Sequence, residues 1–126
     1  MADDSIPKVP TGTRAAGKRL WDAVLADYVL EQHELGLLRE MVRTTDVLDE
    51  LNAVIRRDGL IVAGPGGADR VHPAAVEARQ ARIVLARLSA ALRLPAGEEG
   101  DAQQDARRPQ RRVGARGVYR IKGVAG

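Results

Sequence analysis

The residues most suited to chemistry lie in the segment DGLIVAGPGGADRVHP, residues 58–73, where a glycine cluster interrupts a helical pattern. A glycine-rich loop binds nucleotide phosphates when lysine and serine or threonine follow it, because the lysine neutralises phosphate and the hydroxyl holds magnesium. Here the cluster is followed by Ala68-Asp69. The strand and crossover helix of a parallel sheet, which a dinucleotide site requires, are also missing from the pattern. We therefore interpret the segment as a turn.

The two histidines are possible metal ligands. His33-Glu34 lacks the second histidine four residues on that a zinc protease requires, and His72 has no ligand partner at metal spacing. Both histidines are therefore expected to cap a helix or to face solvent.

Three carboxylates, Asp46, Asp49 and Glu50, share one side of a long predicted helix and in principle suit magnesium. Arginines lie within a few turns of them, and an ion-paired, solvated helix face is the more common arrangement. The sequence thus predicts no enzyme active site, no bound metal and no cofactor.

Basic residues are the remaining candidates for a binding site. The net charge is +3, and residues 95–126 hold the whole excess because residues 1–94 are balanced. Acids come first in this tail, and an acid-free run follows: Arg107, Arg108, Arg111, Arg112, Arg116, Arg120 and Lys122. Such a run can neutralise DNA phosphates without reading bases. A second cluster, Arg14, Lys18 and Arg19, begins the first predicted helix.

Helical periodicity organises most of the chain. Residues 1–12 are predicted to be a disordered arm, and an amphipathic helix follows Thr13. A long helix is predicted from about Glu31 to Arg57, ended by Gly59 in a left-handed conformation. The segments LIV and RVH then pair as a hairpin.

The next helix is predicted to open at Pro73, with His72 at the cap position, and to stop at Pro95. The expected domains are the arm over 1–12, a helical core and oligomerisation domain over 13–95, and a flexible acidic-then-basic tail over 96–126. The fold class is mainly α, with Leu38, Leu48, Leu85 and Leu88 at core or interface positions.

The amino-acid composition excludes several classes of protein. Cysteine is absent, which excludes disulfides and thiolate metal sites and fits a reducing cytoplasm. No stretch approaches the roughly 18 apolar residues of a membrane span, and the first twenty residues contain no apolar leader core. We therefore expect a soluble protein without a membrane partner.

The two longer predicted helices carry more apolar residues than one helical pair covers. Self-association would bury this surplus, and so would the first helix within a single copy. Both interpretations remain open at the level of sequence.

The order of several residues resembles a known family. The first features are Gly17, Leu20 and Trp21 at a helix start and the segment HELGLLREMVRTTDVLDEL with Asp46. The others are Asp58-Gly59-Leu60 before a glycine-rich hairpin, and His72-Pro73 opening an Ala/Arg-rich helix that ends LRLP. Together they resemble the small subunit of tailed-phage terminases. The resemblance covers roughly residues 12–95. One departure concerns the closing Leu-Gly-Leu of the family, which is Leu92-Arg93-Leu94 here, so the last helix is expected to end differently.

The resemblance implies a non-catalytic DNA-packaging factor that forms a homo-oligomeric ring in the cytoplasm of the infected bacterial host. Its implied partners are double-stranded viral DNA and the large terminase subunit, which holds the ATPase and nuclease. The basic tail would then contact DNA, dock on the large subunit or only solvate the ring.

Two other classes stay open. One is a small dimeric helical DNA-binding regulator, although no glycine separates its first two helices and acids open the second. The other is a purely structural adaptor that binds no nucleic acid.

Overall fold

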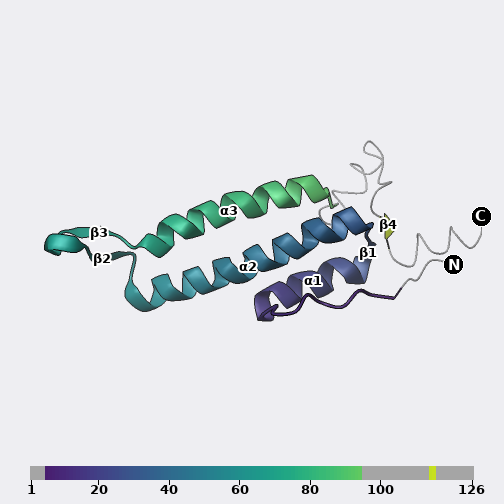
Figure 1. The fold of residues 1–126 in the computed structure, drawn as a ribbon, viewed down its shortest axis with the longest axis horizontal. Coiled ribbons are helices and arrows are strands. Elements are labelled where there is room, and N and C mark those ends of the chain that lie inside the picture. Colours follow the sequence, from purple (N-terminus) through teal and green to yellow (C-terminus); the bar gives the residue numbers. More distant parts are fainter. Residues whose placement is uncertain (1–4, 95–113, 116–126) are drawn as a thin grey trace, which may run out of the picture.

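Helices dominate the described chain, residues 5–94 and 114–115 of the computed structural model (Figure 1). The elements in order are α1 (Ala15–Asp27), β1 (Tyr28–Val29), α2 (Gln32–Asp58), β2 (Ile61–Ala63), a 3₁₀ turn η1 (Pro65–Gly67), β3 (Asp69–Val71), α3 (Pro73–Leu92) and β4 (Gly114–Ala115). The predicted order of helix, long helix, hairpin and helix is confirmed. Helix α2 lies between α1 and α3 and packs against both.

Helix α1 buries one stripe of residues against α2. Gly17, Trp21, Val24 and Leu25 are its buried positions, and their spacing of three to four residues places them on one side of the helix. The helix ends where Tyr28 turns to extended backbone. The predicted amphipathic helix after Thr13 is therefore present.

The segment before α1 is described from residue 5 onward, and residues 5–12, which the sequence placed in a disordered arm, make specific contacts with the helices. The indole Nε1 of Trp21 donates a hydrogen bond to the carbonyl of Pro7 at 3.0 Å. Val9 packs against the core, and the hydroxyl of Thr13 donates to the carbonyl of Pro10 at 2.6 Å. A buried indole requires an acceptor for its N–H, and the Pro7 carbonyl is that acceptor.

Local chemistry sets the ends of α2 and α3. Glu31 and Glu34 form a capping box at the start of α2. Gly59 ends α2 with φ 88° and ψ 158°, a positive φ as predicted but with ψ extended, because the chain passes directly into the hairpin. Pro73 opens α3, and the His72 side chain accepts from the backbone N–H of Ala74 at 2.9 Å, as a cap should.

Helix α3 ends before the predicted stop. Its last helical residue is Leu92, and Arg93 follows in the left-handed region with φ 60° and ψ 44°. Glycine is the usual residue at such a helix end, because it adopts this conformation without a side-chain penalty.

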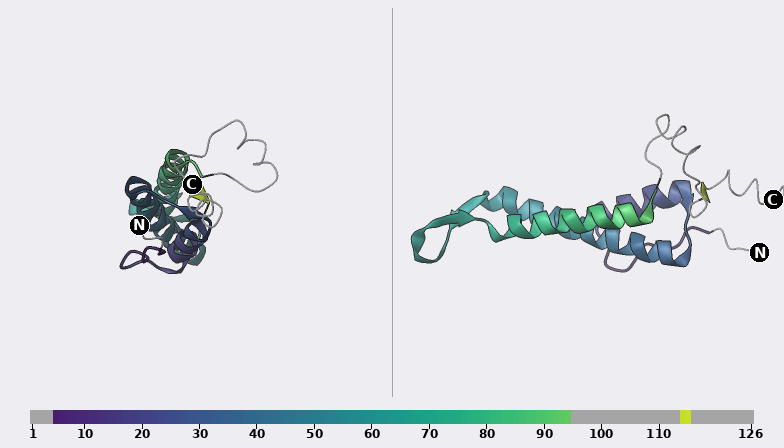
Figure 2. Two further views of the ribbon diagram at one scale, coloured as in Figure 1. Left: turned by 90° about the vertical axis from the view of Figure 1, so that its right-hand side faces the viewer. Right: turned by 90° about the horizontal axis from the view of Figure 1, so that it is seen from above.

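The β2–β3 hairpin extends past the ends of both long helices (Figures 1 and 2). Its strands are antiparallel, with Ile61 opposite Val71 and Ala63 opposite Asp69. Because side chains alternate along a strand, these four residues share one face of the ribbon.

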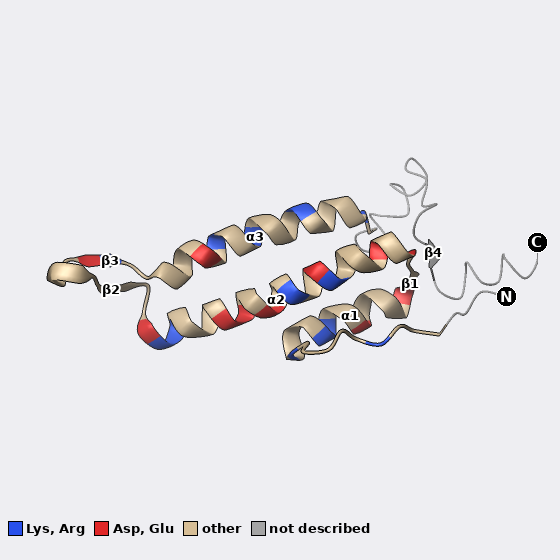
Figure 3. Cartoon of the chain, in the orientation of Figure 1, with Lys and Arg blue, Asp and Glu red and all other residues tan. Residues whose placement is uncertain are grey.

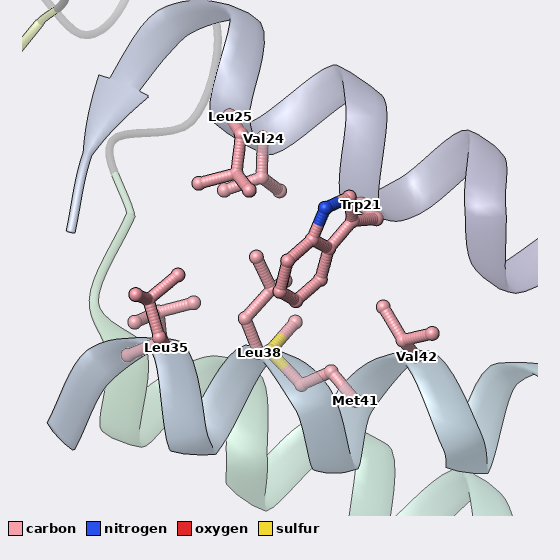
Figure 4. Close-up of a cluster of buried hydrophobic side chains, with 8 residues drawn as sticks. Trp21, Val24, Leu25, Leu35, Leu38, Met41 and Val42 are labelled. Atoms are coloured by element: carbon pink, nitrogen blue, oxygen red, sulfur yellow. The ribbon is translucent and has the colours of Figure 1, made fainter. Parts of the chain in front are cut away.

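The large buried side chains gather at the other end of the molecule (Figure 4). Seven of them come from α1 and the first part of α2, and one comes from the end of α3: Trp21, Val24, Leu25, Leu35, Leu38, Met41, Val42 and Leu92. Figure 4 shows the Trp21 ring pointing from α1 toward Leu38 and Met41 of α2. The core thus sits where α1 covers α2.

Beyond that region, α2 and α3 form a two-helix arm. Helix α1 is 13 residues long and α2 is 27, so α1 covers only the first part of its neighbour. Val47 is 49% exposed on α2, and Val76, Ile83 and Val84 are 41–45% exposed on α3. The first helix therefore leaves the apolar surplus of the arm uncovered.

Candidate functional site

The basic cluster at the start of α1 is partly neutralised within the chain. Arg14 forms an ion pair with Glu50 of α2, and the Lys18 ammonium lies 2.7 Å from Asp22 on its own helix. Arg19 is exposed and makes no ion pair with any residue of the described chain. Exposed pairs of this kind contribute little stability, so Lys18 can exchange Asp22 for a phosphate at small cost.

A carboxylate from α2 holds the first turn of α1. The N-cap residue Arg14 provides no side-chain cap, and instead Asp46 accepts from the backbone N–H of Arg14 at 2.7 Å and from that of Gly17 at 2.6 Å. An anion is favourable at this position because the first N–H groups of a helix lack partners and carry partial positive charge. The contact requires glycine, since a Cβ on Gly17 would lie 2.7 Å from the Asp46 Oδ2.

The three carboxylates that in principle suit magnesium make separate contacts. Asp46 caps α1, Glu50 pairs with Arg14, and Asp49 is exposed. Within residues 5–94 and 114–115, His, Asp and Glu form no group that could hold a metal ion. A small pocket of about 230 Å³ remains beside the start of α1, lined in part by Arg14, Arg43, Asp46 and Glu50.

The predicted DNA-contact run of the tail lies outside the described residues: Arg107, Arg108, Arg111, Arg112, Arg116, Arg120 and Lys122. Two residues inside this stretch are described. Gly114 pairs with Val29 and Ala115 with Tyr28, in an antiparallel arrangement at the connection between α1 and α2. This short ladder was not predicted, because the sequence of the tail shows no apolar alternation.

The four leucines predicted at core or interface positions are all at least partly buried. Leu38 is fully buried, and Leu85 and Leu88 are partly buried against the core. Leu48 is half-buried and belongs to the arm beyond the core.

A groove opens on one side of the arm, and no local pattern in the sequence indicates it. Its volume is about 500 Å³, and Val47 and Leu51 of α2 face Ala81 and Val84 of α3 across it. Glu40, Arg43, Thr44, Glu77 and Gln80 complete its lining. Two helices that meet without a third one above them leave such a trough, which only a tertiary arrangement reveals.

The base of the hairpin is fixed by polar contacts. The Nε2 of His72 lies 2.9 Å from Asp58 Oδ2, and the His72 backbone N–H donates to the Leu60 carbonyl at 2.7 Å. Since Nδ1 accepts from Ala74, the neutral ring carries its proton on Nε2 and donates to Asp58. Hydrogen bonds from Arg57 and then His72 hold the pKa of Asp58 well below its usual range.

Charge is distributed unevenly over the helices (Figure 3). Acidic residues recur along α2, whereas α3 carries arginines and a single acid, Glu77.

None of the helices within residues 5–94 is long and apolar enough to cross a membrane. No protein-family model matches the chain, and neither a curated protein nor a solved structure matches it.

Proposed function

We propose that this protein is a small subunit of a phage terminase. In this proposal it is a non-catalytic factor that assembles into a homo-oligomeric ring, binds double-stranded viral DNA and recruits the large terminase subunit. The infected bacterial cytoplasm is its proposed location.

The uncovered arm of α2 and α3 is the observation that carries the proposal. Half-exposed Val47, Val76, Ile83 and Val84 lie on a helical pair that α1 does not reach. An exposed apolar surface of this kind typically marks a contact with another protein surface. Assembly of identical copies buries it without requiring any further component.

The residues behind the family resemblance also have interlocking structural roles. Gly17 allows Asp46 to cap α1, Trp21 fills the core, and His72-Pro73 starts α3. Each of these residues thus has a structural role, and Gly17 and Asp46 depend on each other directly.

The proposed DNA contacts are the basic tail run and the start of α1. On α1, Arg19 is the strongest candidate because its charge is not compensated by an ion pair in the described chain, whereas Arg14 is held by Glu50. In a ring each weak phosphate contact is repeated in every copy, which multiplies its effect on affinity.

A dimeric helix-turn-helix regulator is less well supported. Helix α2 would be its recognition helix, but Glu34 in the first turn is fully buried and caps the helix through the backbone of Glu31 at 2.8 Å. The start of α2 is thereby covered and acidic, which is unsuited to a major groove lined by phosphates.

Native mass and DNA binding together test the proposal. We expect a closed oligomer larger than a dimer, and an affinity for duplex DNA whose logarithm falls linearly with the logarithm of salt. Replacing the seven basic residues of the tail run by glutamine should flatten that slope. Arg19→Gln should flatten it further, by about 0.9 for each DNA phosphate per assembly that is no longer neutralised.

Arg87→Gln is the matched control, because Arg87 is an exposed arginine on α3 rather than on α1. It should leave the slope unchanged. A monomer at micromolar concentration, or no binding to duplex DNA at low salt, would contradict the proposal.

A further inference from the structure

The free face of the β2–β3 hairpin is apolar at its base. Ile61 and Val71 are directly paired across the strands and are 53% and 50% exposed. A two-stranded ribbon has little stability of its own in water, so an uncovered aliphatic pair on it is a costly arrangement. This pair is therefore suited to a contact with another apolar surface.

The groove of the arm has the matching character. Val47, Leu51, Ala81 and Val84 form its aliphatic lining, and Val47 and Val84 are nearly half-exposed. Within one copy the hairpin points away from the helices and beyond their ends, so it does not cover the groove of its own chain (Figures 1 and 2). Each copy thus offers one apolar projection and one apolar trough.

We propose that the hairpin mediates assembly, and that its Ile61–Val71 face packs into the α2–α3 groove of a second copy of this chain. The inference rests on the proposed self-association and assigns the surfaces that make it. A projection and a trough at different places on one chain can join reciprocally in a pair or successively around a ring.

One charged pair can form at the edges of the two surfaces. Asp69 lies on the same hairpin face as Val71 and forms no ion pair within residues 5–94. The groove lining contains one base, Arg43 of α2, beside two acids, Glu40 and Glu77. Arg43 now pairs with the exposed Glu40 three residues away. Exchange of that weak local pair for Asp69 of the second copy retains a charge contact at the rim.

Disulfide trapping between mixed copies tests the contact directly, because the chain contains no cysteine. One preparation carries Ile61→Cys and the other Val84→Cys, so any covalent dimer of the two joins hairpin and α3 from different copies. The control replaces Val84→Cys by Ile83→Cys, the adjacent residue on α3, which has similar exposure and lies outside the groove lining. We expect at least a fivefold higher yield of the mixed dimer with Val84→Cys.

Native mass of Ile61→Asp provides a second measurement. We expect at least a tenfold rise in the concentration needed for assembly, whereas Ile6→Asp, an equally exposed isoleucine of the N-terminal segment, should have no effect. Helical circular dichroism should be unchanged in both variants, since both side chains are exposed in the single copy.

The outcomes separate this inference from the proposed function. Equal disulfide yields with Val84→Cys and Ile83→Cys, in a protein that still assembles and binds DNA, would overturn the hairpin contact and leave the packaging role intact. A chain that stays monomeric at all concentrations would overturn both.

Discussion

The carboxylate of Asp46 lies 2.6 Å from the backbone nitrogen of Gly17, and through this contact helix α2 caps helix α1. The two residues are 29 positions apart in the chain. The contact fixes the start of α1 along α2, while Trp21 fixes the middle of the same helix through the core. A polar clamp and an apolar anchor therefore set the position of α1 together.

Removal of the clamp should lower stability. Asp46→Ala deletes the acceptor of two backbone N–H groups, and we expect the free energy of unfolding to fall by about 1–3 kcal/mol. Urea denaturation followed by circular dichroism measures the change. Asp49→Ala, an exposed acid on the same helix, should change stability by less than about 0.5 kcal/mol. Equal effects of the two substitutions would contradict the role of Asp46.

Two glycines in helices should respond to alanine with opposite signs. Gly17→Ala places a methyl group 2.7–2.9 Å from Asp46 and Val42 atoms, and we expect a loss of about 1–3 kcal/mol. Around Gly36 of α2 a Cβ meets nothing within 4 Å, so Gly36→Ala should stabilise the protein by about 0.5–1 kcal/mol. Thermal unfolding of both variants measures these changes, and the melting temperature should fall for Gly17→Ala and rise for Gly36→Ala.

Replacement of Arg93 by glycine should stabilise the protein. A residue with a side chain loses roughly 1–2 kcal/mol in the left-handed conformation that Arg93 adopts after α3. We expect Arg93→Gly to raise the free energy of unfolding by about 0.5–1 kcal/mol, the remainder being offset by the flexibility of glycine in the unfolded chain. Arg93→Ala keeps the penalty and should show no gain in the same denaturant series.

The carboxyl of Asp58 should contribute to acid sensitivity. Its pKa is lowered in the folded protein by hydrogen bonds from Arg57 and His72, so the folded state binds this proton less readily than the unfolded state does. The resulting stability is present above about pH 4, the ordinary range for aspartate, and is lost as pH falls toward the lowered folded pKa. Asp58→Asn should therefore flatten the decline in melting temperature below pH 4. An unchanged pH profile would contradict this assignment.

Trp21 should control the order of the segment before α1. Trp21→Phe keeps an aromatic ring in the core but removes the N–H that binds the Pro7 carbonyl. Amide exchange of residues 8–12 should accelerate in this variant, while exchange in α3 stays as in the parent protein. A segment that remained equally protected would be held by Val9 packing alone.

The helices and the hairpin were predictable because their signals are local. Gly59 and Pro73 mark a helix end and a helix start by backbone chemistry alone, and the register of the hairpin follows from the apolar runs around the glycine cluster. The cap by His72 was predictable for the same reason, since it involves residues only two positions apart.

The missed features depend on contacts between distant parts of the chain. The Asp46 clamp requires knowledge of how α1 lies along α2, and the contact between the N-terminal segment and the core requires the Trp21 indole to reach Pro7. The groove appears only once Val47 and Val84 face each other from different helices. Periodicity indicated an apolar surplus on the two longer helices without locating the surface that it forms.

The one-sided core also implies an uneven resistance to local opening. The Trp21 end, where three helices share buried side chains, forms a unit that should open last, and the arm with its hairpin should open at a lower cost. A second molecule docked on the arm adds its binding free energy to the weakest part of the fold. The motions of the arm, rather than those of the whole chain, would then depend on how many copies of the protein are present.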